Sequence, residues 1–132
     1  SPKLNFPGLD DLMKRYQAKA ADLKTDAIGY AFVPFGYTNG QILDQAVTAT
    51  KSLDHDVLAK YIHGHSFKTV VGELSFGKDG EWSKPRMVLT QFQNIEPSNT
   101  DQFKAGAKQP ILWPPEYKTG EMIYPYADAR KK

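Results

Sequence analysis

Apolar residues recur at helical spacing in three stretches of the first half of the chain, and each stretch predicts an amphipathic helix. The oxygen atoms of short side chains accept hydrogen bonds from the free N–H groups in the first turn of a helix. Asp10 is therefore the expected N-cap of the first helix, and Ser52 or Asp54 is the expected N-cap of the third helix. The expected bounds are about residues 10–23 and 36–50, with a shorter third helix that ends at Gly64.

The pattern then changes to the period of two that is typical of β-strands. Residues 67–76 are rich in β-branched and aromatic side chains and predict one strand, and residues 86–93 predict a second. Between them, Gly77-Lys78-Asp79-Gly80 has the composition of a turn in which at least one glycine needs a positive φ. We therefore expect an antiparallel hairpin whose loop carries Trp82.

The composition changes again after Glu96, where helical periodicity is absent. A short strand is expected near Gln109 to Trp113, and the remainder is expected to be an irregular tail packed through its aromatic side chains. The chain therefore divides into residues 1–96, with helices and hairpin, and residues 97–132, with the tail. This last segment holds five of the nine prolines, namely Pro97, Pro110, Pro114, Pro115 and Pro125.

The stretch from Gly29 to Tyr37, which we call the aromatic segment, packs four aromatic residues into nine positions directly before the second helix. Pro34 disfavours the α region for the residue before it, so we expect extended backbone through Phe32 and Val33 and helix from about Phe35.

Aromatic rings at the first turn of a helix can line a cleft into which free backbone N–H groups point, an arrangement that suits an apolar ligand with a carboxylate. The alternative is that these rings belong to an ordinary hydrophobic core, as aromatic residues before amphipathic helices usually do. The candidate ligand-binding residues are Tyr30, Phe35, Gly36, Tyr37 and Thr38.

Composition limits the class of protein. A chain of 132 residues, 40% of them hydrophobic and 24% charged, is typical of one globular domain, and no apolar run approaches the roughly 18 residues of a transmembrane helix. Zero cysteines exclude disulfides, zinc–thiolate sites and thiol catalysis. A formal net charge of +2 is too small to indicate nucleic-acid binding, and the chain from Ser1 does not begin with a signal-peptide pattern, so we expect any export signal to have been removed.

The common catalytic patterns are absent from the sequence. The glycine before Ser75 lies three residues away rather than two, so the nucleophile-elbow spacing is not met, and no glycine-rich phosphate-binding pattern occurs. His63 and His65 invite a metal interpretation, but residues two apart at a helix end point in different directions, and histidines there also suit the helix dipole. We therefore expect a protein that is not an enzyme and that has no metal and no cofactor.

Five segments together resemble the C-terminal part of type I periplasmic solute-binding proteins, the branched-chain amino acid receptors of ABC importers. Each segment is short, but their order and spacing are specific, and the resemblance covers nearly all of this chain and about the last third of such a receptor. The segments are Tyr30–Ala49, Phe67–Trp82, Gln91–Gln93, Trp113–Gly120 and Tyr124–Asp128.

The resemblance implies an α/β fold of two three-layer lobes, each a parallel sheet between helices, with the ligand enclosed in the cleft between the lobes. Taken alone, the three helices, hairpin and tail of this chain amount to an α+β fragment of that fold. In this family the helix start that corresponds to Phe35–Thr38 supplies an aromatic contact to the ligand, while most residues that hold the charged ends of an amino acid lie in segments that this chain does not contain. The implied partners are a small carboxylated solute, either an amino acid or an aromatic carboxylate, and a membrane permease, and the implied location is the periplasm.

Two functional interpretations follow. The chain is either a solute-binding component or a structural module, for instance a stable remnant of a receptor, that binds no ligand alone and associates with a second copy of itself. In a receptor lobe, the apolar helix faces would lie against a parallel sheet, and this chain does not contain that sheet. Self-association is therefore expected, because it would cover these faces.

Overall fold

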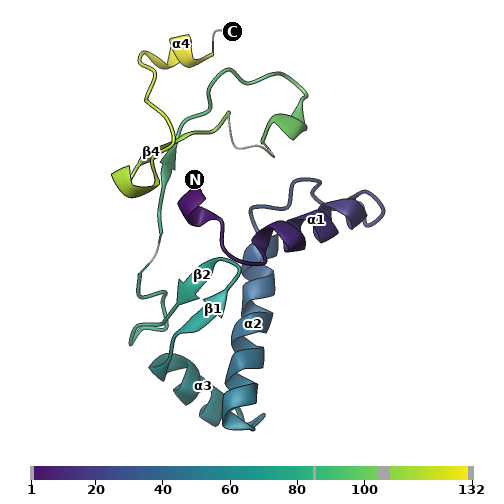
Figure 1. Ribbon diagram of the computed structural model, residues 1–132, viewed down its shortest axis with the longest axis vertical. Coiled ribbons are helices and arrows are strands. Elements are labelled where there is room, and N and C mark those ends of the chain that lie inside the picture. The colour runs from purple at the N-terminus through teal and green to yellow at the C-terminus, as the bar shows by residue number, and fades with distance from the viewer. Residues whose placement is uncertain (1, 85, 104–107, 131–132) are drawn as a thin grey trace. The chain divides into compact units, whose positions relative to one another are not determined.

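The computed structural model describes residues 2–84, 86–103 and 108–130, and shows a mixture of helices and small antiparallel sheets (Figure 1). This content is compatible with the α+β fold class. The chain forms two compact units, which are described separately: the first is Asn5–Arg86, and the second joins the N-terminal residues up to Leu4 to the chain from Met87 onward. This grouping leaves the division into residues 1–96 and 97–132 a prediction.

The three predicted helices are confirmed, as α1 (Leu9–Ala20), α2 (Val33–Thr50) and α3 (His55–Gly64). Asp54 caps α3 as expected, because its carboxylate accepts hydrogen bonds from the backbone N–H groups of the first turn at 3.0 and 3.1 Å. The prediction of Asp10 as the cap of α1 is wrong: the N-cap is Gly8 at φ +86°, and Asp10 lies in the first turn, where a carboxylate suits the helix dipole.

Helix α2 begins at Val33, earlier than the sequence predicted, and Phe32 before it has φ −128° and ψ −31°, so the expected extended backbone at Phe32 and Val33 is wrong. The Val33 N–H donates to the Gly29 carbonyl at 3.1 Å, and Pro34 stands in the first turn, where a residue without an N–H is readily accommodated. The steric preference that a proline imposes on the preceding residue is therefore outweighed here. At the other end, Lys51 adopts φ +55° and donates its N–H to the Val47 carbonyl at 2.8 Å.

The predicted strand over residues 67–76 folds back on itself. Strands β1 (Phe67–Thr69) and β2 (Gly72–Leu74) pair antiparallel with each other, with Thr69 opposite Gly72. The Thr69 hydroxyl donates to the Gly72 carbonyl at 2.7 Å and accepts from the Val71 N–H at 3.2 Å, and Gly72 has φ +101°, so the local chemistry favours a tight reversal.

The predicted turn at residues 77–80 is confirmed, although the long hairpin around it is not. The Gly77 N–H donates to the Glu81 carbonyl at 2.9 Å, the Gly80 N–H donates to the Gly77 carbonyl at 3.0 Å, and Gly80 has φ +79°. The two arms of this turn are joined by an isolated bridge between Phe76 and Trp82 and by a hydrogen bond from the Ser83 N–H to the Ser75 carbonyl at 2.9 Å.

The second unit contains a two-stranded antiparallel sheet. The predicted strand over residues 86–93 is reduced to β3 (Leu89–Thr90), and its partner is β4 (Ile111–Trp113) rather than residues 67–76. The strand expected near residues 109–113 is thus confirmed, and the hairpin expected between residues 67–76 and 86–93 is wrong. The remaining short helices are η1 (Pro2–Leu4), η2 (Thr100–Phe103), η3 (Pro115–Tyr117) and α4 (Tyr126–Ala129).

The core of the first unit lies between α2, α3 and the β1–β2 hairpin, which stand side by side in Figure 1. The ring of Tyr61 meets Phe67 edge to face, with 6.3 Å between centroids. Among the described residues, no helix is both long enough and apolar enough to cross a membrane. The buried apolar residues of this core are Ile42, Ala46, Leu58, Phe67 and Leu74.

Candidate functional site

The aromatic side chains at the start of α2 are exposed. Tyr30, Phe35 and Tyr37 keep 42, 51 and 44% of their surface accessible, whereas Ile42 and Ala46, further along the same helix, are buried. The interpretation of these rings as ordinary core therefore does not describe this chain.

Asp26 anchors the loop that leads into α2. Its carboxylate accepts hydrogen bonds from the backbone N–H groups of Ile28 at 3.0 Å and Gly29 at 2.9 Å, and these bonds hold the pKa of Asp26 below its ordinary value. Tyr16 donates its hydroxyl to the Asp26 carbonyl at 2.7 Å, and Gln17 donates to the Ile28 carbonyl at 2.9 Å. Helix α1 thereby fixes the position from which the aromatic segment starts.

The first turn of α2 offers fewer free N–H groups than the sequence suggested. Val33 and Gly36 donate to carbonyl oxygens within the chain at 3.1 and 2.9 Å, and Pro34 has no N–H. At most one donor, that of Phe35, is left among the first four residues of the helix. A carboxylate bound at this helix end would need partners from elsewhere.

A shallow hollow of about 390 Å³ lies along the exposed side of α2. Gly36 and Tyr37 from the predicted site line it together with Gly40, Gln41 and Asp44. The two glycines leave its floor open, because a Cβ built on either has nothing within 4 Å apart from its chain neighbours and the nearby backbone of α2. It contains one carboxylate and no cation, so it suits a neutral or positively charged group.

The other predicted site residues do not line this hollow. Tyr30 and Phe35 are exposed and are close in sequence to its lining residues Gly36 and Tyr37. Thr38 is buried, with 3% of its surface accessible, and its Oγ1 has no hydrogen-bond partner in the described part of the chain. The accessible part of the predicted site is therefore Tyr30, Phe35, Gly36 and Tyr37.

The polar groups that the sequence offered for catalysis or metal binding form other contacts. His65 stacks on Tyr61 with 3.8 Å between ring centroids, and its Nδ1 lies 2.8 Å from the Tyr61 carbonyl oxygen. The Ser75 hydroxyl forms its hydrogen bond with Ser83 at 2.6 Å. Within residues 2–84, 86–103 and 108–130, no group of three or more histidines and acidic residues is arranged to hold a metal ion.

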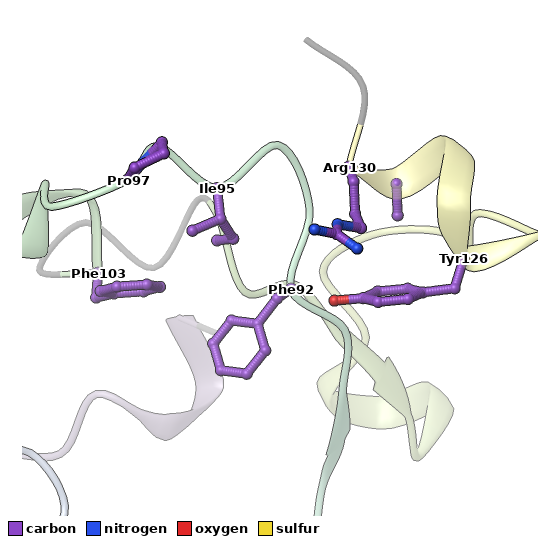
Figure 2. A pocket seen from close by; sticks show the side chains of 7 residues that line it. Phe92, Ile95, Pro97, Phe103, Tyr126 and Arg130 are labelled. Carbon is purple, nitrogen blue, oxygen red and sulfur yellow. The ribbon is translucent and has the colours of Figure 1, made fainter.

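A larger hollow of about 780 Å³ lies in the second unit and was not predicted (Figure 2). We call it the C-terminal hollow. The sequence signal for it is weak, because its aromatic residues are spread over residues 92–126 without a local motif. Its lining residues are Phe92, Ile95, Pro97, Phe103, Tyr126, Ala129 and Arg130.

Comparison of the sequence with profiles of known protein families gives no match, and comparison with curated proteins gives none either.

Proposed function

We propose that this chain is part of a periplasmic solute-binding protein of the ABC-importer type, and that the exposed start of α2 contacts a small amino acid. The observation that carries the proposal is the exposure of three rings: Tyr30, just before α2, and Phe35 and Tyr37, in the first turns of that helix. Exposed rings on a fixed helix end provide rigid apolar contact area at a low cost in side-chain entropy.

The hollow beside α2 favours an amino acid over a simple carboxylic acid as the ligand. Asp44 lines this hollow together with Tyr37, and none of the described residues pairs with its carboxylate. The ammonium group of an amino acid could lie at Asp44 while its side chain contacts the ring of Tyr37.

The proposal assigns the carboxylate of the ligand to residues outside this chain. The start of α2 keeps at most one free N–H, and the hollow contains no cation. The resemblance supports the same division, because the family holds the charged ends of its ligands mostly through other segments. The two lobes with parallel sheets, the membrane permease and the periplasmic location belong to this proposal as well.

The test uses the complete solute-binding protein that this proposal implies. It is titrated with L-leucine and with L-phenylalanine, and binding is measured by calorimetry. Tyr37→Ala and Phe35→Ala should each weaken binding by roughly 1–3 kcal/mol, the value expected for removing a buried ring face. Asp44→Asn should weaken binding of the amino acid more than that of the matching deaminated acid. Leu53→Ala, at an exposed apolar position after the end of α2, is the control and should leave binding unchanged. Unchanged affinity for both ring variants would remove these residues from the site.

A second candidate function is a structural module that associates with another copy of itself. The observation that favours it is the exposed apolar surface of α2: Leu43 is 51% accessible, and the exposed rings of Phe35 and Tyr37 lie on the same helix. A second copy would cover this surface without any ligand.

A further inference from the structure

The C-terminal hollow is formed by three segments of the second unit. Phe92 and Ile95 come from the chain after β3, Phe103 ends η2, and Ala129 and Arg130 belong to the last turn of α4 and its cap. Ala129 is fully buried. In Figure 2 the Tyr126 hydroxyl and the Arg130 guanidinium both point toward the side of the hollow where Phe92 lies.

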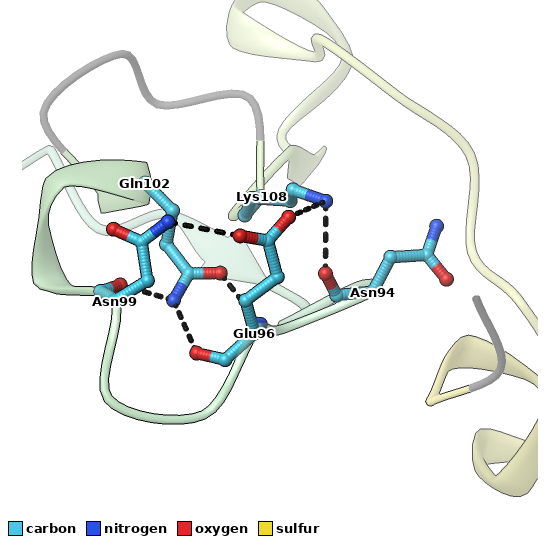
Figure 3. A network of polar contacts seen from close by, with 5 residues as sticks. All are labelled: Asn94, Glu96, Asn99, Gln102 and Lys108. Carbon is cyan, nitrogen blue, oxygen red and sulfur yellow. Dashed lines mark hydrogen bonds and ion pairs between the residues drawn. The ribbon is translucent and has the colours of Figure 1, made fainter.

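Backbone and lysine contacts hold two of these segments together. The Asn94 N–H donates to the Ala129 carbonyl at 2.7 Å, which fixes the end of α4 against the chain after β3. The Lys108 ammonium donates to the Asn94 carbonyl at 2.9 Å and lies 3.6 Å from the Glu96 carboxylate (Figure 3). Asn94 is therefore held both by the end of α4 and by Lys108, which fixes the chain between Phe92 and Ile95.

The wall that carries Pro97 and Phe103 is fixed by one glutamine. The Gln102 side chain accepts a hydrogen bond from the Glu96 N–H at 2.8 Å and donates to the Glu96 carbonyl at 2.8 Å, as a paired strand would (Figure 3). Phe103 then meets Phe92 edge to face, with 5.9 Å between centroids and 81° between the rings. The apolar surface is thus preorganised instead of being created by a ligand.

Two more glutamines hold the chain that leads to α4. Gln91 donates to the Ile123 carbonyl at 2.9 Å and accepts from the Ile123 N–H at 3.0 Å, and Gln93 donates to the Glu121 carbonyl at 2.7 Å. Gln91 and Gln93 flank Phe92 in the chain after β3, so these contacts hold the segment that presents Phe92. A hollow built with so many specific contacts has the rigidity that a binding site needs.

The chemistry of the lining residues selects a class of ligand. The volume of about 780 Å³ lies within the range of small-molecule sites, and the walls are mainly aromatic and aliphatic. Arg130 is the one charged residue of the lining, and within the described ranges it forms no ion pair. A guanidinium binds a carboxylate through paired N–H donors, and the Tyr126 hydroxyl is a further donor.

We propose that the C-terminal hollow binds a small monocarboxylate with an aromatic or branched apolar body. The carboxylate lies at the Arg130 guanidinium and the Tyr126 hydroxyl, and the apolar body lies between Phe92 and Phe103. This site is separate from the start of α2 and does not rest on the proposed function, because all of its residues belong to the other compact unit.

The test is a titration of the ¹⁵N-labelled chain with phenylacetate, followed by amide chemical shifts. Phenylacetate should produce saturable shifts at Phe92, Ala129 and Arg130, and neutral phenylacetamide should bind at least about tenfold more weakly. Arg130→Gln should weaken phenylacetate binding by a similar factor and bring the two probes to equal affinity. Arg130→Lys should give an intermediate affinity, because the charge remains while the paired donors are lost.

Arg15→Gln is the matched control, since it removes a guanidinium that pairs with Asp11 at 2.9 Å on α1, in the other unit. This variant should bind phenylacetate as the parent does. The proposal is overturned if phenylacetate causes no saturable shift at the C-terminal hollow, or if it binds Arg130→Gln as tightly as the parent. Shifts confined to Tyr30, Phe35 and Tyr37 would also overturn it while leaving the proposed amino acid site intact.

Discussion

The side chain of Gln45 forms both hydrogen bonds that a neighbouring strand would offer to Lys68: it donates to the Lys68 carbonyl at 3.0 Å and accepts from the Lys68 N–H at 3.3 Å. Gln41, one helical turn earlier, accepts from the Val70 N–H at 2.9 Å. Helix α2 thereby satisfies the free edge of β1 with side-chain amides, which explains how so short a hairpin is held against the helix.

Gln45→Ala should therefore destabilise the chain by about 1 kcal/mol, because two backbone groups of β1 lose a partner while helix propensity hardly changes. Chemical denaturation monitored by circular dichroism measures the effect. Asn39→Ala, at an exposed position of the same helix, is the control and should be neutral or slightly stabilising. If both variants unfold at the same denaturant concentration, the Gln45 contacts contribute nothing to stability.

The sequence predicted the three helices because periodicity and capping are local properties, as the match of Asp54 to α3 illustrates. The strand pattern over residues 67–76 was less informative, since it does not show that the Thr69 hydroxyl and Gly72 favour a reversal. The partner of β3 is β4, which lies in the proline-rich segment after Glu96, and such non-local pairing cannot be read from the spacing of residues.

The candidate site was predicted only in part, for a similar reason. The cluster of Tyr30, Phe35 and Tyr37 is visible in the sequence, but whether rings are buried depends on what packs over them, which only the structure shows. The C-terminal hollow combines Phe92 with Arg130, and the hydrogen bond between Asn94 and Ala129 that brings them together involves backbone atoms alone. A hydrogen bond between backbone atoms does not depend on which residue types form it, so the sequence does not reveal it.

The two hydrogen bonds to the Asp26 carboxylate predict a pH dependence of stability. They lower the pKa of Asp26 in the folded chain below its ordinary value of 3.8, so their contribution is present above that pH and is lost as the pH falls through the folded-state pKa. Asp26→Asn should be less stable than the parent at neutral pH and should lose less stability on acidification. Thermal melts at neutral pH and below 3.8 measure both effects. Asp22→Asn, at an exposed position of the same loop, is the control; equal acid sensitivity of parent and Asp26→Asn would contradict the assignment.

Gly80 is the glycine of the turn at residues 77–80 that has a positive φ. It has φ +79°, a conformation that β-branched residues rarely adopt, so Gly80→Val should destabilise by about 1 kcal/mol or more. Gly64→Ala is the contrasting control: an added Cβ meets open space at the end of α3, and alanine reduces the freedom of the unfolded chain. Denaturant midpoints should therefore move in opposite directions, and a Gly80→Val variant as stable as the parent would show that the turn relaxes without strain.

The exposed apolar side chains of α2 lead to a final prediction, about the oligomeric state of the chain in solution. Burying exposed apolar side chains of α2, such as that of Leu43, stabilises by about 25 cal/mol per Å² of apolar surface, so association with a second copy, through α2 and the proline-rich tail, is expected at micromolar concentration. Light scattering should then give a mass above the 14.8 kDa of one chain. Leu43→Glu should shift the mass toward the monomer, whereas Leu53→Glu, at an exposed position after the end of α2, should not. A monomer mass together with a cooperative melt would show instead that the chain closes its own core and that the α2 surface is free for a ligand.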